Sequence, residues 1–191
     1  MEEEKIRIRG GFWMNAVSQV LKKPIIKWLV KSEVSKRELS KALGVSRQSP
    51  TDWTKDKPTP VTPENGVRIS DYANDSDLTM SIIYQFFGIF RPMDGDVYKS
   101  DLSASDDLQE LEEDERDEAK RLAKRVLCKE VQRLTTADHT LLIKLAKEQA
   151  EVIFAGIQFL NALCKVENIS IMDLFSMFMK DWQDAGYFGG D

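Results

Sequence analysis

The sequence predicts an all-α protein, with a five-helix N-terminal domain followed by a C-terminal domain of about three helices. Apolar residues recur at steps of three and four over most of the chain, which is the period of an amphipathic helix. Residues that favour helix starts precede these runs, and glycine or proline follows several of them. The 42% of hydrophobic and 31% of charged residues are typical of a globular protein.

The chain is expected to open with an arm over residues 1–13, in which Gly10 and Gly11 form a flexible break. Residues 15–31 then have the apolar period of a helix. Pro24 lies inside this run, so it should either kink the helix or mark its boundary.

Two short helices are predicted to follow. The first covers 35–43, because Ser35 and Glu38 have the spacing of a capping box and Gly44 can end a helix. The second is predicted to be capped by Ser46 and to run for about ten residues.

Two more helices complete the predicted N-terminal domain, which extends over 14–90. Thr62 followed by Pro63 combines a cap residue with proline at the first helical position, and this helix should run through Tyr72. Residues 78–90 are so apolar that they are expected to form a core helix.

An acidic linker is predicted over 91–104, because this stretch lacks an apolar period. The C-terminal domain, 105–191, should then consist of helices over about 105–133, 135–166 and 170–182.

The long helix over 135–166 carries a heptad seam, with apolar residues in alternating steps of three and four. The seam is expected to be buried, either inside the C-terminal domain or between two copies of the chain, and we predict a homodimer. The C-terminal helices are also a candidate site for a protein partner. The residues predicted to support oligomerisation are Leu142, Leu145, Val152, Phe159 and Leu163.

Charge is divided unevenly along the chain. Residues 1–68 carry fourteen Lys and Arg against eight Asp and Glu, whereas 69–191 carry thirteen against twenty-four. A basic N-terminal region suits contact with a polyanion, and the acidic C-terminal region does not.

Several functional classes are disfavoured by the residues present. The sequence has no hydrolase triad pattern and no glycine-rich phosphate loop, and its one histidine, His139, excludes a multi-histidine metal site. We therefore expect no enzyme activity, no cofactor and no metal. Cys128 and Cys164 lie in apolar helical contexts and are expected to be buried free thiols.

No apolar run approaches the roughly 18–20 residues needed to span a bilayer. The acidic residues that follow Met1 have the wrong charge for a signal peptide. These two observations predict a cytoplasmic protein.

The most informative stretch is 35–53, SKRELSKALGVSRQSPTDW. Leu39, Ala42 and Leu43 should line the inner face of the first helix, with Ser40 as the alternative small residue at the helix crossing. Gly44 permits the left-handed backbone of a tight turn. Val45 should fill the corner, and Trp53 should anchor the second helix to the core. Such a pair of helices can place the second one in the major groove of DNA.

This stretch resembles the lambda-repressor-like helix-turn-helix family. The resemblance rests on Glu38-Leu39, Ala42-Leu43-Gly44-Val45-Ser46 and then Trp53, and it extends over about 14–90. It implies a DNA-binding regulator similar to those of phages and mobile elements of Gram-positive bacteria. Pro50 departs from the pattern, because the family usually has a branched apolar residue there. It is expected to remove one backbone bond and open the first turn of the second helix.

The motif assigns roles to its exposed residues. Arg47 and Gln48 are predicted to read base edges, because arginine matches guanine and glutamine matches adenine in bidentate fashion. Thr51 is predicted to contact a thymine methyl group or a phosphate. Backbone phosphates are the predicted targets of Ser35, Lys36, Ser46, Lys55 and Lys57.

We interpret the chain as a sequence-specific transcriptional regulator that binds double-stranded DNA as a dimer. Two alternatives remain. The motif could have lost DNA contact and serve as a protein-interaction module, such as an antirepressor or adaptor. The chain could instead be an accessory protein that binds DNA with little sequence preference, in which case phosphate contacts alone would set its affinity.

Overall fold

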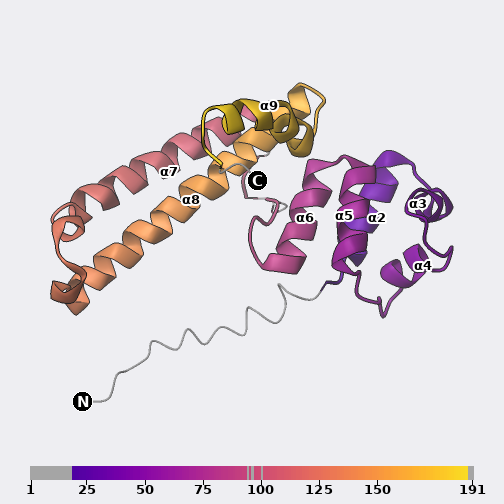
Figure 1. Cartoon of the computed structure of the whole chain (residues 1–191), viewed down its shortest axis with the longest axis horizontal. Coiled ribbons are helices and arrows are strands. Elements are labelled where there is room, and N and C mark those ends of the chain that lie inside the picture. Colours follow the sequence, from indigo (N-terminus) through magenta and orange to yellow (C-terminus); the bar gives the residue numbers. More distant parts are fainter. Residues whose placement is uncertain (1–18, 94, 96, 100, 189–191) are drawn as a thin grey trace, which may run out of the picture. The chain divides into compact units, whose positions relative to one another are not determined.

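The computed structural model describes residues 19–188 except 94, 96 and 100, and the chain divides into two compact units between Pro92 and Met93 (Figure 1). All regular structure in the described part is helical, which confirms the predicted all-α class. The predicted arm over 1–13 lies outside the described residues.

Unit 1 contains five helices in its described part. They are α2 (Lys22–Ser32), α3 (Lys36–Ala42), α4 (Ser49–Thr54), α5 (Pro63–Ala73) and α6 (Ser76–Phe87). The cap residues expected from the sequence start two of them, since the Ser35 hydroxyl caps α3 and the Thr62 hydroxyl accepts the Asn65 N–H at the start of α5.

Proline sets the start of α2. Pro24 is the third residue of this helix, within the first turn, where a backbone N–H would have no helical partner. Pro24 therefore marks a boundary, which is one of its two predicted effects. The helix ends at Glu33, whose backbone turns left-handed with φ of 58°.

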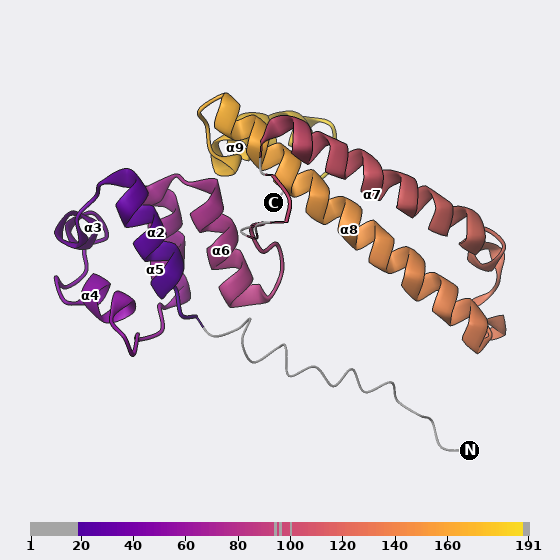
Figure 2. The same ribbon diagram turned by 180° about the vertical axis from the view of Figure 1, so that it is seen from behind.

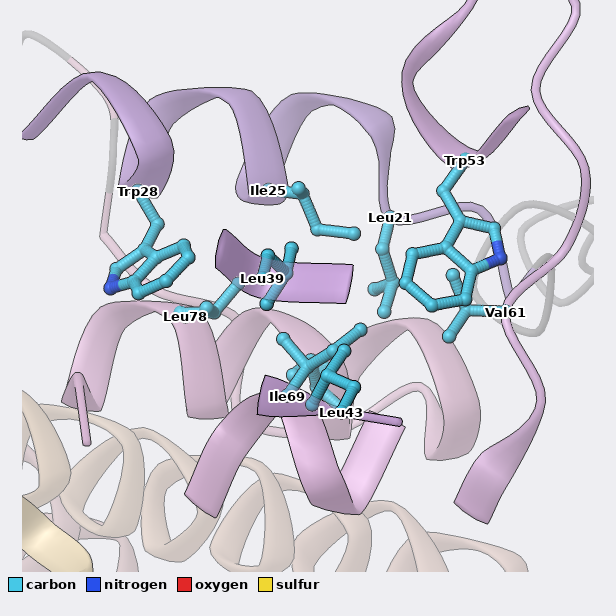
Figure 3. Close-up of a cluster of buried hydrophobic side chains, with 10 residues drawn as sticks. Leu21, Ile25, Trp28, Leu39, Leu43, Trp53, Val61, Ile69 and Leu78 are labelled. Carbon is cyan, nitrogen blue, oxygen red and sulfur yellow. The ribbon is translucent and has the colours of Figure 1, made fainter. Parts of the chain in front are cut away.

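The core of unit 1 draws side chains from all five helices (Figure 3). Trp53 of α4 is 6% exposed and packs with residues of α2, α3 and α5 in one cluster. The cluster comprises Leu21, Ile25, Trp28, Leu39, Leu43, Trp53, Val61, Ile69, Leu78 and Ile82. Because α3 and α4 both contribute to it, their mutual orientation depends on the packing of the whole unit.

The prediction of a core helix through residue 90 is wrong at its end. Gly88 adopts a φ of 75° and its N–H bonds the Tyr84 carbonyl, so α6 stops at Phe87. Phe87, Ile89 and Phe90 are consequently exposed, although their apolar character alone suggests a place in the core.

Unit 2 is built on a pair of long helices, α7 (Leu102–Ala123) and α8 (Thr136–Val166). They lie side by side and run in opposite directions, as Figures 1 and 2 show. Two short 3₁₀ turns, Val126–Cys128 and Val131–Arg133, connect them, and α9 (Ile171–Asp184) follows α8.

The bounds of α7 differ from the prediction at both ends. Asp101 caps the helix by accepting the Ala104 N–H at 3.0 Å, so α7 begins three residues before 105. It ends at Ala123 because the chain reverses there to pack α8 against α7. Cys128 therefore lies exposed in a 3₁₀ turn, and only Cys164 is the buried thiol that we expected.

Several of the buried side chains of α7 and α8, which pack against each other, are small. Ala119 and Ala123 of α7 and Ala155 and Ala162 of α8 are at most 6% exposed. Side chains this small allow two helix backbones to pack closely.

The predicted seam is displaced from this contact. The fully buried stripe of α8 follows Glu148, Ala155 and Ala162, one position away from the seam. Leu142, Leu145, Val152 and Phe159 are half-buried, and Leu163 is 38% exposed.

A capping box holds the start of α8. The Asp138 carboxylate accepts hydrogen bonds from Lys129 Nζ at 2.7 and 2.8 Å and from the N–H and hydroxyl of Thr135, each at 2.8 Å. These donors stabilise the charged carboxylate, above all the Lys129 ammonium, and lower the pKa of Asp138 to about 2.

We expect this network to make unit 2 sensitive to acid. A carboxyl group whose pKa is lowered by folding stabilises the folded state above its unfolded pKa of 3.8, and this contribution is lost as the pH falls toward 2. Asp138→Asn should therefore lower the urea midpoint of unit 2 at pH 6 and have little effect at pH 2. The urea midpoint of unit 2 is measured from the protection of the α8 amides against hydrogen exchange. The matched control is Asp106→Asn, which changes an exposed carboxylate on α7. An equal loss for Asp138→Asn at both pH values would contradict the linkage.

No single described helix is both long and apolar enough to span a membrane. The pair α8 and α9 meets these two criteria only when the helices are taken together, and a bend of 100° separates them.

Candidate nucleic-acid interface

The first element of the candidate interface is α3. The Ser35 hydroxyl accepts the Glu38 N–H at 3.2 Å, and the Glu38 carboxylate accepts the Ser35 N–H at 2.8 Å and its hydroxyl at 2.7 Å. The predicted capping box is thus confirmed, and the two Ser35 donors lower the pKa of Glu38. Lys36 follows in the first turn with an exposed side chain.

A tight turn ends α3 and leads into α4. Gly44 has a φ of 64°, the Gly44 N–H bonds the Lys41 carbonyl, and the Val45 N–H bonds the Ser40 carbonyl at 3.0 Å. This pair of bonds is the Schellman motif, in which glycine supplies the left-handed residue. Val45 packs against the core cluster, as predicted for a residue that fills the corner.

The small residue on the inner face of α3 is Ser40. It is 2% exposed, and its hydroxyl is satisfied by the Arg37 carbonyl at 2.8 Å. Ala42 is exposed, so its predicted place on the inner face is wrong and the alternative at Ser40 is correct. A hydroxyl that bonds one turn back along its own helix can be buried at low cost.

Regular helix α4 begins at Ser49, two residues later than a cap at Ser46 would place its start. Pro50 lacks the N–H that would bond the Ser46 carbonyl, and the first helical bond runs from the Asp52 N–H to the Gln48 carbonyl at 2.9 Å. Ser46 instead receives the Ser49 N–H on its hydroxyl at 3.2 Å. The predicted base readers Arg47 and Gln48 therefore lie in the turn before the helix.

Pro50 also has a role in packing. Its ring is fully buried, at the position where the family pattern calls for an apolar side chain. As the second residue of α4 it lies in the first turn, where a missing N–H is tolerated. The buried Thr54 hydroxyl then bonds the Pro50 carbonyl at 2.7 Å. Pro50, Trp53 and Thr54 together form the inward face of α4.

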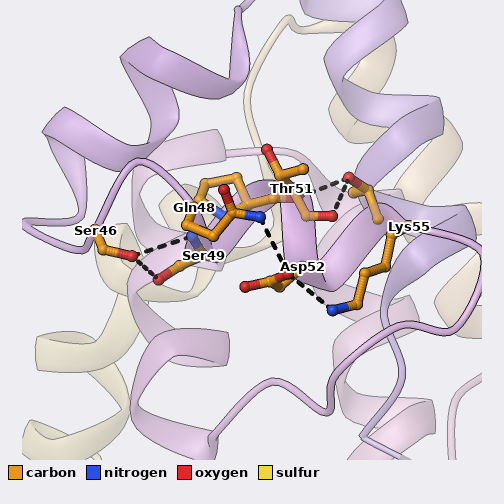
Figure 4. A network of polar contacts seen from close by, with 8 residues as sticks. Ser46, Gln48, Ser49, Thr51, Asp52 and Lys55 are labelled. Carbon is orange, nitrogen blue, oxygen red and sulfur yellow. Dashed lines mark hydrogen bonds and ion pairs between the residues drawn. The ribbon is translucent and has the colours of Figure 1, made fainter.

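The opposite face of α4 carries a polar network (Figure 4). Asp52 Oδ1 accepts hydrogen bonds from Gln48 Nε2 at 3.2 Å and from Lys55 Nζ at 2.8 Å. Both donors, Lys55 first, lower the pKa of Asp52. Thr51 and Arg47 are exposed, and Arg47 forms no hydrogen bond or ion pair within the described residues.

All the residues predicted to contact DNA have exposed side chains, namely Ser35, Lys36, Ser46, Arg47, Gln48, Thr51, Lys55 and Lys57. The structure joins Gln48 and Lys55 through Asp52, whereas Lys57 lies beyond the end of α4. The hydroxyls of Ser35 and Ser46 are both engaged in local caps.

Two residues of this region were not foreseen from the sequence. Asp52 joins two predicted contact residues, and its spacing of four from Gln48 and three from Lys55 would have placed all three on one helix face. Arg68 of α5 reaches the Leu43 carbonyl at 3.4 Å and pairs with Glu64 at 2.8 Å, which ties the end of α3 to α5. No local sequence pattern predicts the hydrogen bond between Arg68 and Leu43, because the two residues are distant in the chain.

A group of carboxylates is the only candidate cation site among the described residues. The carboxylate oxygens of Glu112, Glu148 and Glu151 lie within 4.8 Å of one another. Lys147 pairs with both Glu148 and Glu151, so the cluster already has a counter-ion from the same helix. Burial and the neighbouring acids raise the pKa of Glu112.

Comparison with protein-family models, curated proteins and solved structures finds no match to this chain. The likeness of residues 35–53 to the lambda-repressor-like helix-turn-helix family therefore stays a resemblance.

Proposed function

We propose that unit 1 binds double-stranded DNA with α4 in the major groove and that the chain is a sequence-specific transcriptional regulator, similar to those of phages and mobile elements. The observation that supports this most is the division of α4 into two faces. Pro50, Trp53 and Thr54 are buried, while the turn before α4 and its outer face expose Arg47, Gln48 and Thr51.

The exposed side chains have the chemistry of base recognition. The major-groove edge of guanine presents two acceptors that suit the five donors of Arg47, and adenine presents a donor and an acceptor that suit the Gln48 amide. Both residues precede the first turn of α4, and the start of a recognition helix is the part that approaches base edges.

The basic residues around α4 suit the phosphate backbone. Lys36, Lys55 and Lys57 are exposed, and their ammonium groups would displace counterions from DNA. Such contacts fix the register of a protein on the duplex without reading its sequence.

We further propose that two copies of the chain bind one operator. The half-buried residues Leu142, Leu145, Val152 and Phe159, with the exposed Leu163, leave apolar surface on α8 that a second copy would cover. A two-fold dimer would place its recognition helices about 34 Å apart, which is one turn of DNA. The preferred site is then expected to be a near-palindrome.

The test compares Arg47→Ala with Lys36→Ala. Duplexes selected from a random library by the parent protein provide a preferred site, and equilibrium titrations follow at two fixed salt concentrations. Arg47→Ala should weaken binding to that site by ~1–3 kcal/mol and relax one base position. Lys36→Ala should weaken all duplexes about equally and reduce the salt slope by about one.

The same experiment separates the alternatives. If both variants bind every duplex like the parent, the assignment of the reading surface is wrong. A parent that binds all duplexes equally would support the accessory protein, and a parent that binds none would support the protein-interaction module.

A further inference from the structure

An acidic side chain occupies the middle of the surface that we assign to DNA. Asp52 is the only carboxylate between Ser46 and Lys55, and it lies outside the buried face of α4 that Pro50, Trp53 and Thr54 form. Its side chain is 32% exposed. A carboxylate beside DNA phosphates weakens binding by repulsion, so a surface that contacted only phosphates would gain from replacing it.

The hydrogen bonds of Asp52 leave part of its acceptor capacity unused. Gln48 and Lys55 both donate to the same oxygen, Oδ1, and no described residue donates to Oδ2 (Figure 4). An ionised carboxylate accepts about four hydrogen bonds, so acceptor sites remain for a ligand. Lys55 offsets the negative charge and holds the carboxylate in place.

Once water is excluded from the contact, these acceptor sites need a hydrogen-bond donor from the DNA. Phosphates have no donor. In the major groove the only donors are the amino groups of cytosine and adenine. Adenine also presents N7, an acceptor that suits an amide and not a carboxylate, so cytosine N4 is the partner that matches a carboxylate.

We propose that Asp52 is a specificity-determining residue that accepts a hydrogen bond from cytosine N4 and disfavours guanine and thymine at one position of the site. Guanine and thymine present oxygen acceptors there, which would leave the carboxylate without a donor. The Gln48 amide keeps its carbonyl oxygen and one N–H for a neighbouring base, so Asp52 also orients it. This inference rests on the proposed function.

The test uses Asp52→Asn and its matched control Asp56→Asn in the full-length chain. Asp56 is exposed just beyond α4 and pairs with Lys22 at 3.0 Å, so both variants remove one negative charge near the same surface. Affinities are measured for the selected site and for duplexes that replace each cytosine in turn. Circular dichroism of both variants verifies that their helix content equals that of the parent.

The parent should prefer cytosine over guanine or thymine roughly tenfold at one position. Asp52→Asn should abolish that preference and bind unrelated duplexes more tightly, whereas Asp56→Asn should keep it. An unchanged preference in Asp52→Asn, or an equal loss in Asp56→Asn, overturns the inference and leaves the proposed function intact. A parent without base preference overturns the role of Asp52 but not DNA binding, and a parent that binds no duplex overturns both.

Discussion

Trp53→Ala is expected to remove a large part of the stability of unit 1. Trp53 is 6% exposed and belongs to the core cluster, so its removal leaves a cavity in that core. Truncation of a buried tryptophan costs ~3–5 kcal/mol. A unit of this size is stable by only about 5–14 kcal/mol, at roughly 0.05–0.15 kcal/mol per residue.

Urea unfolding followed by hydrogen exchange measures this loss. The α5 amides should lose most of their protection in Trp53→Ala, whereas the α8 amides should keep theirs. The proposed DNA binding should fall in proportion to the folded fraction of unit 1.

Trp182→Ala is the matched control, because it makes the same truncation in α9. Trp182 is half-buried and contacts Phe175 edge-on, with 5.3 Å between ring centroids. It should leave the protection of the α5 amides unchanged. Protection of α5 in Trp53→Ala equal to that of the parent would show that the core described for unit 1 is wrong.

The second large effect concerns unit 2, where Ala155→Asp should separate α7 from α8. Ala155 is 1% exposed in the middle of α8, whose main neighbour is α7. A carboxylate at this position would be buried without a partner, which costs roughly 3–5 kcal/mol. The Glu151 carboxylate one turn earlier adds repulsion.

Ala150→Asp is the control for this prediction. Ala150 is exposed on the same helix, so the substitution carries the same loss of helix propensity without burial. The difference between the two urea midpoints of unit 2 therefore isolates the contact of α7 with α8. Equal midpoints would mean that these helices do not pack through the face that contains Ala155.

Local patterns were sufficient for the starts of α3, α5, α8 and α9 and for the turn that ends α3. The capping boxes at Ser35, Thr135 and Ser170 depend on residues three apart, and a glycine such as Gly44 acts through its own backbone. These interactions involve near neighbours in the chain, so they can be predicted from the local sequence alone.

The ends of helices, and the helix faces that are buried, were harder to predict from the sequence. Residues 124–133 have helical apolar spacing, yet the chain reverses there because α8 must return along α7. The predicted seam over 142–163 lies one position away from the stripe of α8 that is buried, which follows Glu148, Ala155 and Ala162. Burial of this kind depends on a partner that is distant in sequence.

The sequence by itself determined the helical class, the caps at Ser35, Thr62, Thr135 and Ser170, the left-handed turn at Gly44 and the identity of the exposed polar residues around α4. Those features follow from backbone preferences and from hydrogen bonds between near neighbours. The tertiary structure decided that Pro50 is buried and that α4 starts only at Ser49. The burial of Pro50 and Trp53 gives α4 its orientation, because packing against other helices selects which side of a short helix faces solvent.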